Sequence, residues 1–382
     1  MSISENPTPY FTVDNALFAN WRSENGWGAP KRYLDADDTM TADSAYRYVS
    51  EGIGLLWKGD FQNGRQLLQA LIRRLDKRPP KLGDLTYPER FYRIRLNRAQ
   101  RARTLGMLLV PFETGHRLTH RRAPDVTLAC QEAYGDSDAP LVIPFTELLG
   151  VISAHEWRKK GLRIAALDGN IHAHYGVFAP TRNEYLDLIM QAPLARAELA
   201  MDIGTGTGVI ALALAKRGIK KIIATDNNPR AMACASSNIA LFSLGKQIEI
   251  QQTDLFPADK SGLMQQADLI VCNPPWIPGK PSSLLETAVF DPDQHMLKGF
   301  VKQVGQYLKP GGEAWLVLSD LAEYLGLRQR DELLSLFTDS GLKVIDRLEI
   351  KPTHRKINDA DDPLAELRSK EMTSLWRLKV NK

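Results

Sequence analysis

The sequence has little cysteine, no long hydrophobic run and little excess charge. Its three cysteines, Cys130, Cys234 and Cys272, lie far apart among 382 residues and lack metal-site spacing. We therefore expect buried thiols in a reducing compartment. No apolar run approaches the roughly 18–20 residues of a membrane-spanning helix, and the first residues show no secretory signal. A net charge of +4 identifies no partner. These absences predict a cytoplasmic globular protein with no membrane partner.

The length of the chain favours two domains. Apolar residues at helical spacing predict a mainly helical N-terminal domain over residues 1–160. Its expected helices cover 41–56 and 61–77, and a third begins near Pro88. Residues 162–178 alternate around the turn signal Asp168-Gly169. We therefore expect a β-hairpin linker at 161–179, followed by a second domain at 180–382.

Basic residues are concentrated in one part of the N-terminal domain. Residues 65–103 contain twelve lysines and arginines but three acidic residues. Such a stretch could follow nucleic acid phosphates, with Arg93, Arg95 and Arg98 as candidate contacts. It could equally be a set of solvated helix faces neutralised by acids elsewhere, or a surface for an acidic protein.

The second domain alternates between short apolar runs and helical segments. The expected strands are 199–202, 221–225, 248–252, 269–272, 313–318, 342–350 and 374–380. Apolar runs bounded by turn residues are typical of strands covered by helices on both faces. The pattern predicts an α/β fold with a doubly wound, seven-stranded, mostly parallel sheet, and an antiparallel edge formed late in the chain.

The first strand of this sheet leads into a glycine-rich turn with the spacing G-x-G-x-G. Gly204, Gly206 and Gly208 allow a sharp turn and close approach of a ligand. Carboxylates stand at three strand ends: Asp202 before the turn, Asp226 after the second strand and Asp254 after the third. Each alone also fits a helix cap or turn. Together they favour a cationic adenosyl ligand, S-adenosyl-L-methionine, over a pyrophosphate.

The fourth strand ends in Asn273-Pro274-Pro275-Trp276. The lone pair of an amide or base NH2 group is delocalised, so that nitrogen is a poor nucleophile. The side-chain oxygen of Asn273 and the carbonyl of Pro274 can accept its two hydrogens and free the lone pair. Pro275 stiffens the turn, and Trp276 offers a flat face for a planar group. A proline-rich turn with a core tryptophan is the alternative interpretation.

These motifs resemble the class I S-adenosylmethionine-dependent methyltransferases. Within that class the chain is similar to the small-domain group, which includes HemK-like protein-glutamine methyltransferases and nucleobase amino-methyltransferases. The resemblance covers about residues 175–382 and includes Phe178-Ala-Pro-Thr-Arg-Asn-Glu184. It implies a Rossmann-like methyltransferase fold with two sets of site residues. The cofactor set is Thr181, Asp202, Gly204, Thr205, Gly206, Gly208, Asp226, Asn227, Asp254, Leu255 and Asn273; the catalytic set is Asn273, Pro274, Pro275 and Trp276.

Three features depart from the HemK-like pattern. Trp276 replaces the usual tyrosine, the 178–184 motif lacks its second proline, and the N-terminal part is about twice the expected length. We expect an N-methyltransferase that acts on a planar NH2 group of RNA, DNA or a protein glutamine, as a monomer or homodimer without a metal. A small-molecule methyltransferase and a dinucleotide-dependent oxidoreductase are the alternatives.

Overall fold

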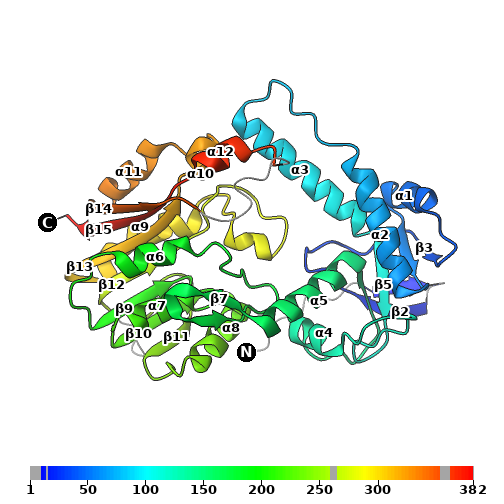
Figure 1. Cartoon of the computed structure of the whole chain (residues 1–382), viewed down its shortest axis with the longest axis horizontal. Helices are drawn as coiled ribbons and strands as arrows, with labels where there is room; N and C mark the ends of the chain where they lie inside the picture. Colours follow the sequence, from blue (N-terminus) through cyan, green and yellow to red (C-terminus); the bar gives the residue numbers. More distant parts are fainter. Residues whose placement is uncertain (1–9, 14–15, 259–264, 353–361, 382) are drawn as a thin grey trace. The chain divides into compact units, whose positions relative to one another are not determined.

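A computed structural model of the chain describes residues 10–13, 16–258, 265–352 and 362–381. The chain divides into two compact units, Met1–Glu156 and Trp157–Lys382, whose elements are labelled in Figure 1. The expectation about the first residues of the chain falls on 1–9, outside the described part. Within the described part, no helix is both long enough and apolar enough to cross a membrane.

The first unit contains a six-stranded sheet with helices packed around it. The strands are β1 (Tyr10–Val13), β2 (Ala16–Trp21), β3 (Tyr33–Ala36), β4 (Gly54–Trp57), β5 (Leu108–Phe112) and β6 (Leu141–Pro144). Their order is β1-β2-β6-β5-β4-β3, and β3, β4 and β5 are mutually parallel. The helices are α1 (Ala42–Ser50), α2 (Phe61–Asp76), α3 (Tyr87–Leu105), α4 (Thr127–Tyr134) and α5 (Phe145–Lys160).

The three helices predicted for this unit are present, the first of them shorter than expected, but α4 and the six-stranded sheet were not predicted. Thr41 caps α1, because its side chain accepts a hydrogen bond from the Ser44 N–H. The helix ends at Ser50 rather than Leu56, and Gly54–Trp57 forms strand β4. All four residues of β4 are buried, so the segment shows no alternation of polar and apolar residues. A short run of this kind cannot be distinguished from a buried helical segment by periodicity.

The predicted hairpin is present but shorter than expected. β7 (Leu162–Ile164) pairs in antiparallel fashion with β8 (Gly169–Ile171), and a 3-10 turn, η1 (Ala165–Leu167), lies between them. Asp168 has a left-handed backbone, with φ +53°. The return strand expected to reach Phe178 stops at Ile171.

The second unit contains the predicted seven-stranded sheet. Its strands are β9 (Leu199–Ile203), β10 (Lys221–Asp226), β11 (Ile248–Gln252), β12 (Ala267–Cys272), β13 (Leu308–Ser319), β14 (Leu342–Ile350) and β15 (Thr373–Val380). Their order is β11-β10-β9-β12-β13-β15-β14. The expected antiparallel edge is wrong in its position. The antiparallel strand, β15, lies between β13 and β14, and the edge strand β14 runs parallel to the others.

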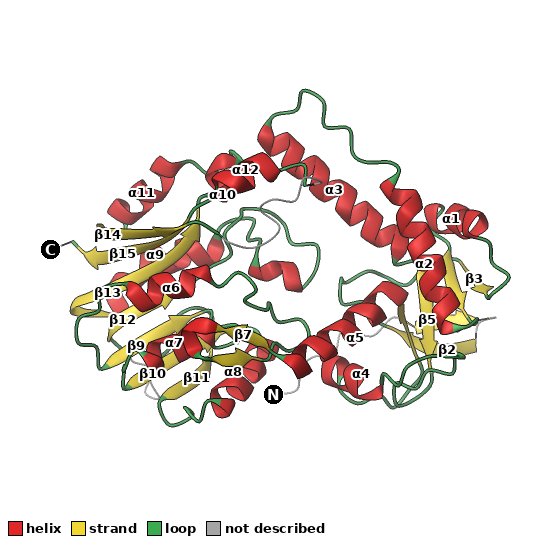
Figure 2. Ribbon diagram, in the orientation of Figure 1, coloured by secondary structure: helices red, strands yellow, loops and turns green. Residues whose placement is uncertain are grey.

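Helices cover both faces of this sheet, as Figure 2 shows. On one face are α6 (Glu184–Gln191), α7 (Val209–Lys216) and α8 (Pro229–Leu241), whose apolar residues form one core. On the other are α9 (His295–Tyr307) and α11 (Arg330–Asp339). Neighbouring residues of β9 point to opposite cores, with Ala200 in the first and Met201 in the second. This is the doubly wound arrangement that the sequence predicted.

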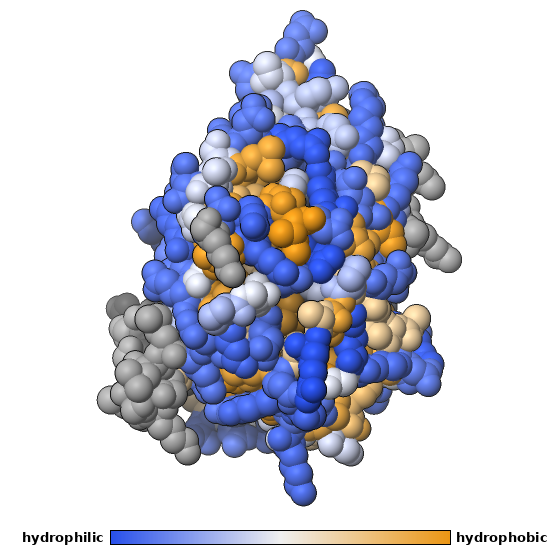
Figure 3. All heavy atoms as spheres, turned by 90° about the vertical axis from the view of Figure 1, so that its left-hand side faces the viewer, coloured by the Kyte–Doolittle hydropathy of each residue, from blue (hydrophilic) through white to orange (hydrophobic). Residues whose placement is uncertain are grey.

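Two shorter helices complete the second unit, α10 (Leu321–Tyr324) and α12 (Ala365–Lys370). The three cysteines are free and buried, as expected. Figure 3 shows hydrophobic residues among hydrophilic ones on one face of the molecule. The exposed apolar residues of α11 and the late strands are Leu334, Val344, Ile345 and Val380.

Candidate active site

The glycine turn joins β9 to α7 at the point where the sheet order reverses. Gly204, Gly206 and Gly208 all have left-handed backbones, with φ +74°, +55° and +84°, which glycine adopts at little cost. The N–H groups of Gly204 and Thr205 donate to the Thr225 carbonyl at 2.9 and 2.8 Å. These hydrogen bonds tie the turn to the end of β10. Ligands of such sheets bind beyond the strand ends at this reversal.

Asp202 fixes the glycine turn through hydrogen bonds that its buried side chain accepts. Its side chain is fully buried, and Oδ2 accepts hydrogen bonds from the Thr205 hydroxyl (2.6 Å) and the Ala211 N–H (3.1 Å). Oδ1 is buried without a hydrogen-bond partner in the structure. Burial raises the pKa of this carboxyl to about 7. Asp202 therefore supports the turn, and it does not line the cavity described next.

A cavity of about 420 Å³ lies over the glycine turn and the ends of β10 and β12. Eight of the predicted site residues line it: Gly204, Gly206, Asp226, Asn227, Asp254, Leu255, Asn273 and Pro275. The other six, which lie outside the lining, are Thr181, Asp202, Thr205, Gly208, Pro274 and Trp276. The structure thus brings most of the predicted cofactor residues and half of the Asn-Pro-Pro-Trp motif to one cavity.

Two of the residues outside the lining, Gly208 and Thr205, have local roles that explain their positions, whereas Thr181 does not. Thr181 is exposed, and α6 begins at Glu184 with Asn183 as its N-cap, not directly after Thr181. Gly208 is the N-cap of α7, where a Cβ would lie 3.3 Å from Ala235 Cα. Its small size allows α7 and α8 to pack. Thr205 donates to Asp202 from inside the turn.

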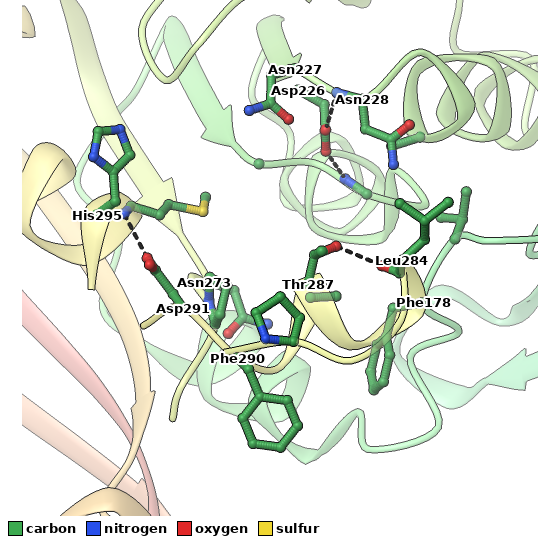
Figure 4. Close-up of a pocket in the computed structure, with 18 of the residues that line it drawn as sticks. Phe178, Asp226, Asn227, Asn228, Asn273, Leu284, Thr287, Phe290, Asp291 and His295 are labelled. Atoms are coloured by element: carbon green, nitrogen blue, oxygen red, sulfur yellow. Dashed lines mark hydrogen bonds between the residues drawn. The ribbon is translucent and has the colours of Figure 1, made fainter. Parts of the chain in front are cut away.

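Asp226 is fixed at the cavity wall by two backbone groups. Its Oδ2 accepts from the Gly206 N–H at 3.0 Å and its Oδ1 from the Asn228 N–H at 2.9 Å, as drawn in Figure 4. Burial raises the pKa of the carboxyl despite these contacts. A carboxylate offers about four lone-pair sites, so Asp226 can still accept two hydrogen bonds from a ligand.

Asn273 projects to the cavity from the end of β12, and Trp276 orients it. The Trp276 indole N–H donates to Asn273 Oδ1 at 2.8 Å. The Arg182 guanidinium lies 4.9 Å from the centre of the Trp276 ring, and it pairs with Glu184 at 3.0 Å and Glu371 at 2.9 Å. The sequence predicted that the ring of Trp276 would meet a planar ligand. In the structure the residue positions Asn273 and stacks with Arg182.

The far wall of the cavity is formed by a segment for which the sequence predicted no role. Ile277–Asp291 folds back on itself, because the Ile277 N–H donates to the Val289 carbonyl and the Asp291 N–H to the Ile277 carbonyl. From this segment Leu284, Thr287 and Phe290 line the cavity. No pattern in the sequence marked the residues between Ile277 and Asp291 as part of a ligand cavity.

The sequence did not predict a role for Met296 at the glycine turn either. Met296 follows the left-handed residue Gln294 at the start of α9, and its N–H donates to Asp291 Oδ2 at 2.9 Å. Its methyl group covers Gly204 so closely that a Cβ there would clash with it. A side chain at position 204 would have to displace the end of Met296, and it would also be strained by the left-handed backbone of the turn. A methionine at a helix start carries no sequence signal for such a role.

Comparisons with known proteins agree with this geometry. A family model described as methyltransferase small domain matches residues 168–338. A putative protein N5-glutamine methyltransferase of Methanocaldococcus jannaschii is 30% identical over 154 residues, 39% of this chain and 75% of that protein. A release factor glutamine methyltransferase of Shewanella oneidensis is 36% identical over 144 residues, 35% of this chain and 49% of that protein.

A third relative has a nucleic acid in its name. A tRNA1(Val) (adenine(37)-N6)-methyltransferase of Shewanella loihica is 29% identical over 170 residues, 43% of this chain and 67% of that protein. The chain spans about half the length of the release factor methyltransferases it matches. The chain belongs to the S-adenosylmethionine-dependent methyltransferases, in the small-domain group that contains HemK-like enzymes.

The lining residues fit this family's cofactor. A Cβ placed on Gly206 would meet no atom within 4 Å, so the turn leaves open space at the strand ends. Acceptors suited to ribose hydroxyls and an adenine amino group stand beside it on Asp226 and Asp254. Asp254 is largely exposed and lies 3.7 Å from His295 Nε2. We expect Gly204, Gly206, Asp226, Asp254 and Leu255 to hold S-adenosylmethionine.

Proposed function

We propose that this protein transfers a methyl group to a planar NH2 nitrogen of a macromolecule, which is a nucleobase of RNA or DNA or a protein glutamine. One observation carries the proposal: Asn273 lines the same cavity as Gly206 and Asp226. The relatives' names include both glutamine and adenine as acceptors. Both groups present a flat nitrogen with two hydrogens, which is the acceptor that Asn273 suits.

The proposed mechanism uses hydrogen-bond acceptors around the nitrogen. Bound S-adenosylmethionine supplies a methyl group that a positive sulfur already activates. An amide oxygen has two lone pairs, and the Trp276 indole N–H occupies one on Asn273 Oδ1. The second can accept one N–H of the acceptor. We propose that the other is accepted by the carbonyl of Pro274, which is itself outside the lining but joins the lining residues Asn273 and Pro275. The two contacts pull the nitrogen toward tetrahedral geometry and position it for in-line attack. The N–C bond would form as the S–C bond breaks, the demethylated thioether would leave, and the nitrogen would give up one of its hydrogens as a proton.

We also propose that residues 1–160 recognise the acceptor, through the α/β unit that precedes the methyltransferase domain. A unit with its own six-stranded sheet is large enough to bind a macromolecule. A cytoplasmic location and a monomeric or homodimeric state complete the proposal.

The decisive experiment is methyl transfer from tritiated S-adenosylmethionine into a lysate of cells that lack the gene. The purified full chain should label macromolecules, and the Asn273→Ala variant should not. Digestion of the labelled material with protease or with nuclease then identifies the acceptor class. Label confined to small molecules would contradict the proposal and favour the small-molecule alternative.

A further inference from the structure

The outward face of α3 combines exposed apolar side chains with arginines. Tyr92 is 54% exposed and Leu96 55% exposed, and they lie one helical turn apart. Arg103 continues this face two turns further on, and Arg93 flanks it. The opposite face carries Phe91, Ile94 and Leu105, which are buried. The apolar residues of the outward face are therefore not part of the core.

Some arginines of this region form salt bridges or hydrogen bonds within the protein, and others are exposed without a salt bridge. Arg74 pairs with Asp43 and Arg101 with Asp76, while Arg90 donates to the Leu85 and Gly83 carbonyls. Arg95 is partly buried and lies over the Phe91 ring. Within the part of the chain that the structure describes, Arg93, Arg98 and Arg103 are exposed and form no salt bridge, but Arg98 is not on the helix face of Tyr92 and Leu96. Of the arginines that the sequence proposed as contacts, Arg95 is therefore a poor candidate.

Acidic residues do not compensate the available charge on this helix. The one acid of α3 is Glu89, and its carboxylate accepts hydrogen bonds from the Thr86 N–H and hydroxyl in a capping box. Exposed arginines without partners attract phosphates. An acidic peptide would also satisfy the charge, but it gives no reason for an exposed aromatic ring beside it. Unpaired bases stack on such rings, with about 1–3 kcal/mol per base.

We propose that the outward face of α3, formed by Tyr92, Arg93, Leu96 and Arg103, binds single-stranded RNA. Arg93 and Arg103 contact phosphates, and Tyr92 stacks with an unpaired base. The arginines are ten residues apart, about 15 Å along a helix, which is a span of a few nucleotides. RNA is favoured over DNA because its loops present unpaired bases, whereas DNA is mostly duplex. This inference rests on the proposed function and names RNA as its macromolecular substrate.

The test is fluorescence anisotropy of a labelled 12-nucleotide unstructured RNA with the full chain. We expect Arg93→Ala with Arg103→Ala to weaken binding at least tenfold, and to reduce the dependence on salt by about 1.4 in the log–log slope. Tyr92→Ala should weaken binding at least fivefold, while Tyr92→Phe should bind like the wild type because its ring still stacks. The matched control is Arg330→Ala with Lys343→Ala, which removes two exposed charges from the second unit.

Equal affinity of the α3 double variant and the control variant would overturn the proposal. So would equal or tighter binding of the DNA version of the oligonucleotide, or binding of an acidic peptide without binding of RNA. Calorimetric titration with S-adenosylmethionine runs in parallel and separates this inference from the proposed function. RNA binding without cofactor binding would reject the methyltransferase proposal and leave the surface intact, and the reverse result would reject the surface alone.

Discussion

At the scale of single residues, one substitution of Asp226 should remove two interactions together. Asp226 fixes the glycine turn through the Gly206 N–H, and we expect it to bind the cofactor ribose. Asp226→Ala should weaken S-adenosylmethionine binding at least tenfold, the usual scale for a hydrogen bond to a charged group. Isothermal titration calorimetry measures this directly. Asp339→Ala, at the exposed end of α11, is the control, and an unchanged affinity of the Asp226 variant would reject the assignment.

Asn273 and Trp276 should affect turnover rather than cofactor binding. Asn273→Ala removes the acceptor of one N–H and should lower the transfer rate by about 10²-fold. Trp276→Phe keeps a ring beside Arg182 but loses the indole donor at 2.8 Å, so we expect a smaller loss, about tenfold. Single-turnover transfer of labelled methyl measures both rates. A variant that loses cofactor affinity but keeps its rate would show that the two sites have been exchanged.

The buried carboxyl of Asp202 predicts a pH dependence of stability. Its folded-state pKa is about 7 and its unfolded value is near 3.8, so the folded chain binds more protons between these values. The free energy of unfolding therefore falls as pH rises from about 4 to about 7. Asp202→Asn is nearly isosteric and should lose this part of the dependence. Thermal midpoints at pH 5 and pH 8 should differ less in the variant, and an equal difference would contradict the prediction.

At the scale of elements, alanine substitutions at two glycines can distinguish the effect of backbone strain on stability from the effect of the glycine turn on ligand binding. Gly206 and Gly218 both have positive φ, +55° and +88°, and a Cβ at either would meet no atom within 4 Å. Alanine at either position should therefore cost stability similarly, about 1–2 kcal/mol. Gly206→Ala should also abolish measurable cofactor binding, because its Cβ enters the cavity, whereas Gly218→Ala should bind normally. Equal cofactor affinity of the two variants would place the ligand elsewhere.

The elements also show why the second unit was predicted well and the first was not. In the second unit, turn residues bound each apolar run, and long helices separate the runs, so β11 was placed at its observed residues, 248–252. In the first unit, β4 follows α1 after three residues and has no polar position. The order of β15 and β14 depends on pairing between strands, which periodicity does not encode.

The site shows the same limit at the level of contacts. Residues at strand ends, such as Asp226 and Asn273, could be predicted because the fold itself brings them together. The inward position of Asp202 could not, since it depends on how deeply α7 packs. The role of Arg182 could not be predicted either, because its partner Glu371 is 189 residues away. Side chains that act through distant partners leave no local pattern.

At the scale of the whole molecule, the two compact units should unfold separately. Each has its own sheet, so we expect two transitions in a calorimetric scan of the full chain. S-adenosylmethionine should raise the midpoint of one transition, by a free energy of about 2.7 kcal/mol at a hundredfold excess over Kd. Asp226→Ala should cancel this shift without moving the other transition. A single transition, or a shift of both, would show that the units are coupled.

The place of β15 within its sheet has a consequence for synthesis on the ribosome. Among the strands that the structure describes, β14 has β15 as its one neighbour, and the segment before β15 carries Glu371, which pairs with Arg182. A nascent chain that has emerged as far as residue 350 can already form the glycine turn with β9, β10 and β12. It cannot yet pair β14 with β15, and it lacks the Glu371 carboxylate that holds Arg182 beside Trp276. During translation, the capacity to hold the methyl donor should therefore precede the capacity to use it.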